Sequence, residues 1–500
     1  MSSSVINAFP GYEYIPRNVI DKDPHNMYRG IDLKFGGYVY SEPGIYTDVA
    51  LLDIQSMHPH SAVALNYFGE YTQHFKDILD ARIAIKNREY DKLEHMFDGK
   101  LMKYLTDDTL ADQLATALKL AINSVYGLTS AKFDNPFRDS RNVNNIVALR
   151  GALFMKTLQD EIVKKGYTVA GIRTDSIKIP NADKDIIAFC MEFADKYSYS
   201  FQHEATYDRL CLVDKAQYVA AYKRPEECEK MYGYIPKDNA KHFKKHSHPW
   251  TTTGDKFQRP YIFKSLFSGE ALTFDDLCET KSASKGEIYL DLNEKLPDVS
   301  IYEKERDRRK NNVLHPDKQL KLNPDFVDIS DEELDSRIAD GHHYAFIGRV
   351  GRFCPIKPGL GGGLLVVYRN DKYDSASGSI GYRWLEAEQV REVGREDDID
   401  RTYHRKQADD AIKAIEEFGS FERFIDTSRP YEDDRPKPKA IDISSEPDAE
   451  PDTDDPPWSD LPPVVPCGDG KYNTCLECPN CVGDVCKAGY SIAVNGGGAA

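Results

Sequence analysis

The sequence of 500 residues lacks long hydrophobic runs, an excess of basic charge and evenly spread cysteine pairs. No run approaches the roughly 20 apolar residues that span a bilayer, and the first residues lack the basic-then-apolar pattern of a secretory signal. These absences predict a cytoplasmic protein with no membrane partner. Five of the ten cysteines are scattered singly and five crowd into positions 467–486. This distribution favours a reducing compartment and one local cluster over a disulfide framework.

Acidic charge is unevenly placed along the chain. The formal net charge is −17, but residues 431–466 alone hold eleven Asp or Glu against three Lys or Arg, with nine of the 27 prolines. Such a segment cannot bury enough apolar surface to offset its chain entropy, so we expect a disordered acidic linker there. Net charge is therefore a poor guide to partners, and local basic patches matter more.

Hydrophobic periodicity predicts an α+β body ahead of this linker. Two successive helices are expected to be antiparallel neighbours because the loop between them is short. Residues 224–335 are expected to be mostly helical and irregular, and 336–390 to form short strands between Gly-rich turns. The other expected elements are a strand over 47–54, the two helices over 71–97 and 108–126, a helix over 145–165, a hairpin over 167–180, a helix over 186–199, strands over 210–213 and 217–222, and a helix over 407–425.

Four short segments carry candidate chemistry. Asp53 ends the first buried strand shortly before Pro59, which places a carboxylate beside backbone amides that can hold phosphate oxygens. Lys119, Asn123 and Tyr126 share one helix face by their spacing of four and three residues. That face could hold a triphosphate and place an aromatic ring near a base.

The remaining two segments are Arg173-Thr174-Asp175-Ser176, in the turn of the hairpin, and Lys215-Ala216-Gln217-Tyr218, at the opening of a strand. A carboxylate held in a tight turn is rigid, as a metal ligand must be. Taken alone, each of the four segments has an ordinary alternative: a strand-end turn, a solvated lysine before a helix-capping glycine, a common turn composition and an exposed strand start.

Taken in order, the segments resemble the motifs of the family B DNA polymerases. Lys119–Gly127 matches motif B, Lys-x-x-x-Asn-Ser-x-Tyr-Gly, at every defined position. Asp53–Pro59 resembles motif A, Asp-x-x-Ser-Leu-Tyr-Pro, and Arg173–Ser176 resembles motif C, Asp-Thr-Asp-Ser. Lys215–Tyr218 resembles the Lys-Lys-x-Tyr strand motif. Arg82 and Lys86, one turn apart, resemble the basic pair that the family places on this helix. Phe35–Tyr38 is more weakly similar to its Gly-Gly loop, and the resemblance covers about residues 30–300.

The resemblance implies a right-hand polymerase architecture within the α+β class. The implied organisation is an N-terminal segment (1–47), a palm (48–70 and 136–222), fingers (71–135), a thumb (223–335), a small β-rich module with a helix (336–430), the acidic linker (431–466) and a Cys-rich tail (467–500).

The resemblance also implies a DNA-directed DNA polymerase that adds deoxynucleotides to a primer with two Mg²⁺ ions. By the match, Asp53, Asp175 and the backbone carbonyl of Ile54 are the metal ligands. The nucleotide-binding residues implied are Ser56, Met57, His58, Arg82, Lys86, Lys119, Asn123 and Tyr126. The implied contacts to primer-template DNA come from Thr174, Lys215 and Tyr218.

Three positions depart from the family pattern. Arg173 replaces the first Asp of motif C, although Asp175 retains the second. His58 stands where the family has a Tyr that excludes the ribose 2′-hydroxyl, so we expect weaker rejection of ribonucleotides. Ala216 replaces a lysine of the strand motif and removes one presumed phosphate or primer contact.

About 50 residues precede motif A, too few for the 3′–5′ exonuclease that the family usually carries there. We therefore expect a chain that lacks its own proofreading activity or that has a separate exonuclease or other replisome chain as partner. Compact chains of this kind resemble viral polymerases, especially those of phages, and such a protein would work in the host cytoplasm. Two alternatives stay open: a catalytically silent, DNA-binding replisome subunit, and a polymerase with a different template or sugar, such as a primase-polymerase.

Two further segments hold candidate ligands. Cys475, Cys478, Cys481 and Cys486 are closely spaced, and four thiolates suit Zn²⁺ or an iron–sulfur cluster, with Cys467 as a competing fifth ligand. The basic run Lys241–Lys245 is a candidate contact to the DNA backbone or a solvated loop. Beside it, His242, His246 and His248 have metal-like spacing, but the sequence shows no carboxylate or cysteine partner nearby.

Overall fold

The computed structural model describes residues 27–33, 36–131, 133–138, 145–292, 299–327, 329–431, 481–482 and 485–486, together with Phe9 and Tyr12. Residues 1–434 form one unit and 435–500 a second. Within the described ranges, no helix combines the length and apolarity needed to cross a membrane. The expected acidic linker, apart from Tyr431, lies outside these residues.

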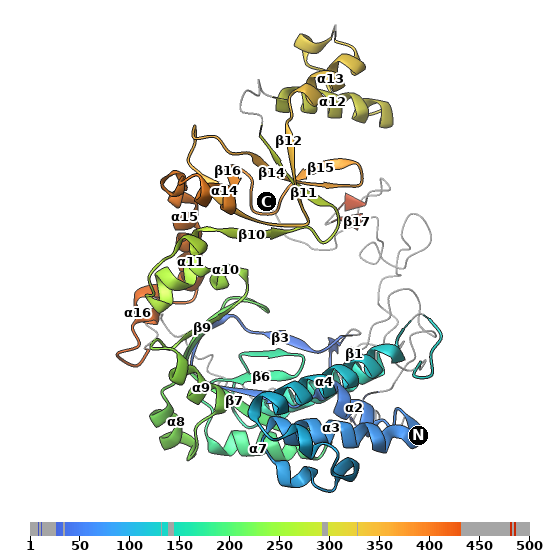
Figure 1. The fold of residues 1–500 in the computed structure, drawn as a ribbon, viewed down its shortest axis with the longest axis vertical. Helices are drawn as coiled ribbons and strands as arrows, with labels where there is room; N and C mark the ends of the chain where they lie inside the picture. Colours follow the sequence, from blue (N-terminus) through green and yellow to red (C-terminus); the bar gives the residue numbers. More distant parts are fainter. Residues whose placement is uncertain are drawn as a thin grey trace, which may run out of the picture. The chain divides into compact units, whose positions relative to one another are not determined.

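A seven-stranded sheet, which includes β3, β6, β7 and β9 of Figure 1, carries the candidate site. Every pairing in it is antiparallel. With the helices that accompany it, this sheet confirms an α+β fold. The strand order is β3 (Val39–Ser41), β5 (Gly171–Arg173), β6 (Ser176–Ile179), β4 (Gly44–Ile54), β7 (Phe201–Leu212), β8 (Tyr218–Tyr222) and β9 (Trp250–Thr253).

Side-chain alternation along β4 decides which face of the sheet receives Asp53. Ala50, Leu52 and Ile54 are buried in a core that also includes α6 (Ile146–Lys164) and α7 (Lys184–Asp195). Val49 and Leu51 belong to a different cluster on the other face. Because successive strand residues point to opposite faces, Asp53 shares the face of Leu51 and leaves the sheet away from the α6 core.

Two long helices follow β4, and their order of contacts confirms that they are antiparallel. They are α3 (Thr72–Lys86) and α4 (Asp108–Thr129). Ile85, at the end of α3, packs with Ala111 near the start of α4, while Leu79 packs with Ile122 further along. The first helix was expected to reach residue 97, but it ends at Lys86 and short 3₁₀ turns follow. Arg88, two residues on, has a φ of 62°, which an α-helix cannot accommodate.

The expected helical and irregular stretch 224–335 contains strands as well as helices. Besides β9, the polar strand β10 and the five-residue strand β11 lie in it. Segments this short give periodicity too few positions to identify them. Its elements are α8 (Pro225–Tyr232), α9 (Lys237–Lys245), α10 (Asp255–Gln258), α11 (Pro260–Phe263), β10 (Glu279–Ser282), β11 (Glu287–Asp291), α12 (Val299–Leu314) and α13 (Asp331–Asp340).

Strands β10 and β11 pair with strands of the β-rich region that follows. One sheet has the order β10-β13-β16 and the other β12-β11-β14-β15. The region ends in helices that pack, through Ala411 and Phe424, against Trp250 of β9. The single helix expected over 407–425 is two helices, α15 and α16. The bounds are β12 (Tyr344–Gly348), β13 (Val350–Ile356), β14 (Leu364–Arg369), β15 (Lys372–Ser375), β16 (Arg383–Glu386), α14 (Ala387–Glu392), α15 (Arg401–Glu416) and α16 (Phe421–Ile425).

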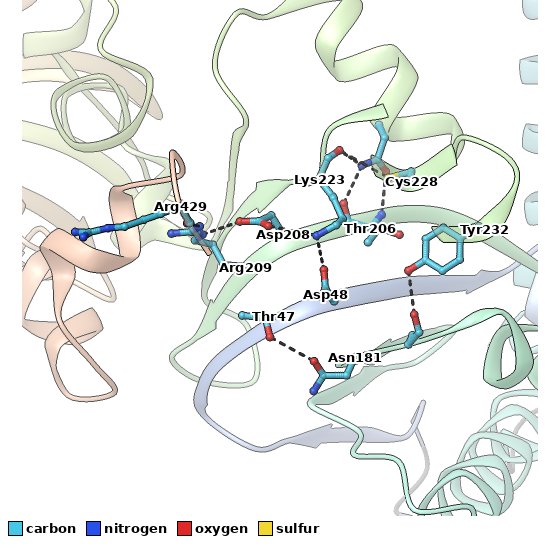
Figure 2. Close-up of polar contacts among 12 residues, drawn as sticks. Thr47, Asp48, Asn181, Thr206, Asp208, Arg209, Lys223, Cys228, Tyr232 and Arg429 are labelled. Carbon is cyan, nitrogen blue, oxygen red and sulfur yellow. Dashed lines mark hydrogen bonds and ion pairs between the residues drawn. The ribbon is translucent and has the colours of Figure 1, made fainter. Parts of the chain in front are cut away.

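Arg209 on β7 anchors the last described segment of this unit. Its side chain is 1% exposed, and its guanidinium donates to the backbone carbonyls of Arg423, Phe424, Asp426 and Arg429 over 2.7–3.2 Å. Its Nε also donates to Asp208 (2.8 Å). Figure 2 shows Arg209 and Arg429 side by side, next to the ion pairs that Lys223 makes with Asp48 and Asp208. These bonds satisfy a buried charge with fixed partners.

Candidate functional site

One cavity of about 310 Å³ collects most of the predicted site residues. It lies where the end of β4, the turn between β5 and β6 and the two helices α3 and α4 meet. The predicted residues that line it are Asp53, Ile54, Ser56, Met57, His58, Arg82, Lys86, Lys119, Asn123 and Asp175. Segments 120 residues apart in the sequence thus form one polar cleft.

Backbone pairing fixes the two carboxylates of this cleft. Asp53 lies opposite Ser176 in the β4–β6 ladder, and the Ile54 amide donates to the Asp175 carbonyl (2.8 Å). A two-residue turn, Thr174-Asp175, joins β5 to β6, and Thr174 adopts a φ of 58°. Such tight hairpin turns favour positive φ at their first central residue. The turn therefore holds Asp175 beside the end of β4.

The cleft disfavours a second negative charge in the absence of a cation. Burial raises the pKa of Asp53 to about 7, and the negative charges of Asp175 and Glu204 add to this effect. Lys86 and Lys178 act in the opposite direction. Hard oxygen donors that repel one another fit a divalent cation such as Mg²⁺, which would offset the repulsion.

Glu204 and Lys178 do not line the cleft, but their charges act on Asp53, and the motifs did not indicate either residue. Glu204 is the additional residue of a bulge in β7, opposite the step from Leu51 to Leu52 in β4. Bulges re-aim side chains next to functional sites. Lys178 pairs with Leu51 and so lies on the face of Asp53, and burial lowers its pKa. A charged residue within an otherwise apolar strand was the signal available for Lys178.

Cations of α3 and α4 face the carboxylates. Arg82 donates to the Ser56 hydroxyl (3.0 Å), and burial lowers the pKa of its guanidinium. Ser56 precedes helix α2 (Met57–Ala64) with a φ of 57°, which bends the chain at this point. Lys86 and Lys119 are exposed at the cleft, and Asn123 lies one turn beyond Lys119. The arrangement offers three positive groups opposite two carboxylates.

Tyr126 does not line the cavity but contacts it through His58. The two rings stack at 5.7 Å between centroids with 14° between planes. Burial lowers the pKa of His58, so its ring is neutral at pH 7. Met57 lines the cavity, yet this residue is only 2% exposed. Its side chain packs against Gly151, where an added Cβ would lie 2.4 Å from the Met57 Sδ. Met57 thus contributes backbone rather than side chain to the cleft.

Thr174, Lys215 and Tyr218 lie outside the main cavity. The Thr174 amide donates to the Tyr38 carbonyl (2.9 Å). The Thr174 side chain packs on Gly37, so closely that a Cβ at position 37 would lie 2.6 Å from Thr174 Cγ2. The glycine-rich loop is therefore needed for this contact. Lys215 and Tyr218 line a separate small cavity with Arg173, and Lys178 lies over the Tyr218 ring (4.9 Å). Arg173 is thus not among the residues that line the carboxylate cleft.

The histidine cluster does have a carboxylate neighbour, contrary to the sequence expectation. Ligand atoms of His246, His248 and Glu270 lie within 4.8 Å of one another. The Trp250 amide, however, donates to Nδ1 of His248 (3.2 Å). This bond places the ring proton on Nε2, the atom that faces Glu270 at 3.8 Å. A metal ion at this atom would have to displace that proton. The neighbouring basic run, Lys241–Lys245, ends helix α9 and is not a loop.

Three cysteines of the cysteine-rich tail, Cys467, Cys475 and Cys478, lie outside the described residues. Cys481 and Cys486 lie opposite each other in the short hairpin of β17 (Cys481–Val482) and β18 (Val485–Cys486). Such a hairpin brings two of the four predicted ligand positions together. A Zn²⁺ or iron–sulfur site in the tail stays a prediction.

No family model and no curated protein matches the chain. Among solved structures, it is similar to the family B DNA polymerase from the hyperthermophilic archaeon Pyrobaculum calidifontis, with 12% sequence identity and a TM-score of 0.36. The alignment covers 81% of this chain and 48% of that one, so the chain spans about half the length of that polymerase. A likeness of this size leaves the function to be argued from the site.

Proposed function

We propose that the chain is a DNA-directed DNA polymerase that adds deoxynucleotides to a primer 3′ end. One observation carries the proposal: Asp53 and Asp175, from neighbouring parts of one sheet, line a single cleft with Arg82, Lys86 and Lys119 from two helices. Paired carboxylates opposite several cations are the arrangement that metal-assisted phosphoryl transfer requires.

The donor set of the cleft suits two Mg²⁺ ions. Asp53, Asp175 and the backbone carbonyl of Ile54 would hold them, because Mg²⁺ prefers a few carboxylates combined with phosphate oxygens and water. Bound there, the ions would lower the pKa of the primer hydroxyl and stabilise charge on the transferred phosphoryl group. Burial, together with the negative charges of Asp175 and Glu204, raises the pKa of Asp53, and a bound cation would offset both effects, which supports this assignment.

The other residues of the cleft would bind and orient the nucleotide and primer. Arg82, held by the Ser56 hydroxyl, would clamp the triphosphate with Lys86 and Lys119. Asn123 and the His58–Tyr126 stack would border the base and sugar. The separate surface around Lys215 and Tyr218, next to the Thr174 turn, would contact the primer strand.

Primer extension tests the proposal. A labelled primer-template is incubated with Mg²⁺ and deoxynucleotides and with wild type, Asp175→Asn or Asp195→Asn. Asp195 is an exposed residue at the end of α7, so its substitution removes the same charge away from the cleft. We expect extension by wild type and Asp195→Asn and none by Asp175→Asn. A wild-type protein that binds the primer-template without extending it would instead be a silent, DNA-binding subunit.

The His58–Tyr126 stack favours one variation on this function, relaxed sugar selection. The histidine ring is smaller than the tyrosine expected there and is held flat against Tyr126. We infer that the pocket leaves room for a ribose 2′-hydroxyl and that the enzyme incorporates ribonucleotides more readily than a polymerase with tyrosine at this position.

A further inference from the structure

Two cysteines outside the cleft lie in contact. Cys278 directly precedes β10, and Cys354 lies in β13. Because Glu279 pairs with Phe353 in the antiparallel ladder of these strands, Cys278 and Cys354 face each other across it. Their Sγ atoms are 3.4 Å apart. Facing positions of an antiparallel pair fall within the Cα separation that a disulfide requires.

The two thiols differ in accessibility. Cys354 is 0% exposed, whereas Cys278 is half-buried and lines a cavity of about 620 Å³. An oxidant can therefore reach Cys278 first, and Cys354 lies directly behind it. This is the arrangement of an attacking and a resolving thiol.

Two arginines favour the thiolate of Cys278. Asp275 binds both Arg352 (2.7 Å) and Arg391 (3.0 Å), and the charges of the two arginines lower the pKa of Cys278 while that of Asp275 raises it. The thiol of Cys354 can donate to Cys278, and this bond with the charge of Arg352 lowers the pKa of Cys278. The buried thiols of Cys190 and Cys228 have their pKa raised to about 12 by burial. They serve as internal references of low reactivity.

We propose that Cys278 and Cys354 form a redox-active pair that reacts with low-molecular-weight disulfides and closes into an intramolecular disulfide. The Cys278 thiolate attacks one sulfur of the external disulfide, forms a mixed disulfide and releases one thiolate. The Cys354 thiolate then attacks the Cys278 sulfur and releases the second. The two cysteines are oxidised by two electrons, the external disulfide is reduced, and the two thiol protons end on the two released thiols.

Closure would link β10 to β13 across the 76 positions that separate the two cysteines. The enclosed segment contains β11, α12, α13 and β12. A cross-link over such a loop restricts the unfolded chain, so the oxidised protein should unfold at higher temperature than the reduced one. The proposal does not depend on the polymerase assignment, because neither cysteine lines the carboxylate cleft.

Peptide mapping tests the proposal on the full chain. Reduced protein is exposed to glutathione disulfide, its free thiols are alkylated under denaturing conditions, and the digest is analysed by mass spectrometry. We expect a linked peptide pair containing Cys278 and Cys354, while Cys190 and Cys228 remain alkylated. The proposal is overturned if this linked pair does not form. It is also overturned if the pair forms no faster than Cys190 and Cys228 are oxidised.

Two variants test the order of attack. In Cys354→Ser the reaction should stop at a glutathione adduct on Cys278, because the resolving thiol is gone. In Cys278→Ser the remaining Cys354 should react with glutathione disulfide at least about tenfold more slowly than Cys278 does in Cys354→Ser. Its rate should be close to that of Cys190. Equal reaction rates of the two variants would contradict the assigned roles. The mapping also separates this pair from the tail cysteines, which yield different peptides.

Discussion

The backbone amide of Ile54 donates a 2.8 Å hydrogen bond to the backbone carbonyl of Asp175. This bond joins the end of β4 to the turn between β5 and β6. The carboxylates of Asp53 and Asp175 are therefore positioned by sheet backbone and not by flexible loops. Ligands held by rigid elements need little reorganisation when a cation binds, and this relationship supports the proposed metal site.

Asp53→Asn should stabilise the protein when divalent metal is absent. The pKa of Asp53 is raised from 3.8 to about 7, so its contribution to stability is fully present at low pH and is lost as the pH rises through about 7. In EDTA the variant should unfold at a higher temperature than wild type near about pH 8, and the difference should shrink steadily as the pH falls, to little near about pH 4. Mg²⁺ should raise the Tm of wild type more than that of the variant. Parallel Tm curves over this pH range would contradict the site electrostatics.

His58→Tyr should sharpen sugar selection. The larger ring would fill space beside Tyr126 that the smaller imidazole leaves open. We expect the ratio of kcat/KM for a deoxynucleotide over its ribonucleotide to rise about tenfold, a difference of about 1.4 kcal/mol. Steady-state incorporation of matched nucleotides measures this ratio, and His74→Tyr, an exposed position on α3, is the control. An unchanged ratio would mean that residue 58 does not border the sugar.

Arg209→Lys should destabilise the folded protein without moving the cleft. Lysine keeps the charge but cannot supply the five hydrogen bonds that the guanidinium makes to Asp208 and to the carbonyls of 423–429. We expect a loss on the order of 3 kcal/mol in the free energy of unfolding, measured by denaturant titration. Arg405→Lys, on the exposed face of α15, should cost close to nothing. Equal effects of the two substitutions would show that Arg209 does not anchor the segment.

His342 should make stability depend on pH above neutrality. Its Nδ1 lies 2.6 Å from the buried Asp291 and its Nε2 lies 3.7 Å from Glu303, which raises its pKa to about 9. The stabilisation is fully present below the ordinary histidine pKa and is lost as the pH rises through about 9, a change on the order of 3 kcal/mol.

Denaturant titration between about pH 6 and 10 measures this dependence, since the window spans both values. His342→Gln should flatten the curve, whereas His343→Gln, its exposed neighbour, should leave the slope as in wild type. A wild-type curve already flat in this window would contradict the assignment.

Sequence alone predicted the helices α4, α6 and α7 and strand β4, which carries Asp53 near its end, because their apolar pattern is long and regular. It did not predict β10, whose residues Glu279–Ser282 are polar and gain strand structure only by pairing with β13. The end of the first long helix was missed because Arg88 adopts a positive φ, a backbone conformation that the apolar periodicity does not record.

The motif spacing also indicated most of the cleft. It gave no sign of Glu204, because a bulge in β7 is a feature of pairing that no local pattern records. Nor did it indicate that Lys215 and Tyr218 line a cavity separate from that of Asp53.

The most direct test of the central claim is the single-turnover rate of adding one deoxynucleotide, measured for Asp53→Asn, Asp175→Asn and the double variant with Mg²⁺. If the two carboxylates act as one unit, each substitution should lower the rate by about a thousandfold or more, and the double variant should be little worse than either one. Losses that add independently in the double variant, or a single variant that keeps the wild-type rate, would contradict the claim that Asp53 and Asp175 jointly hold the catalytic ions.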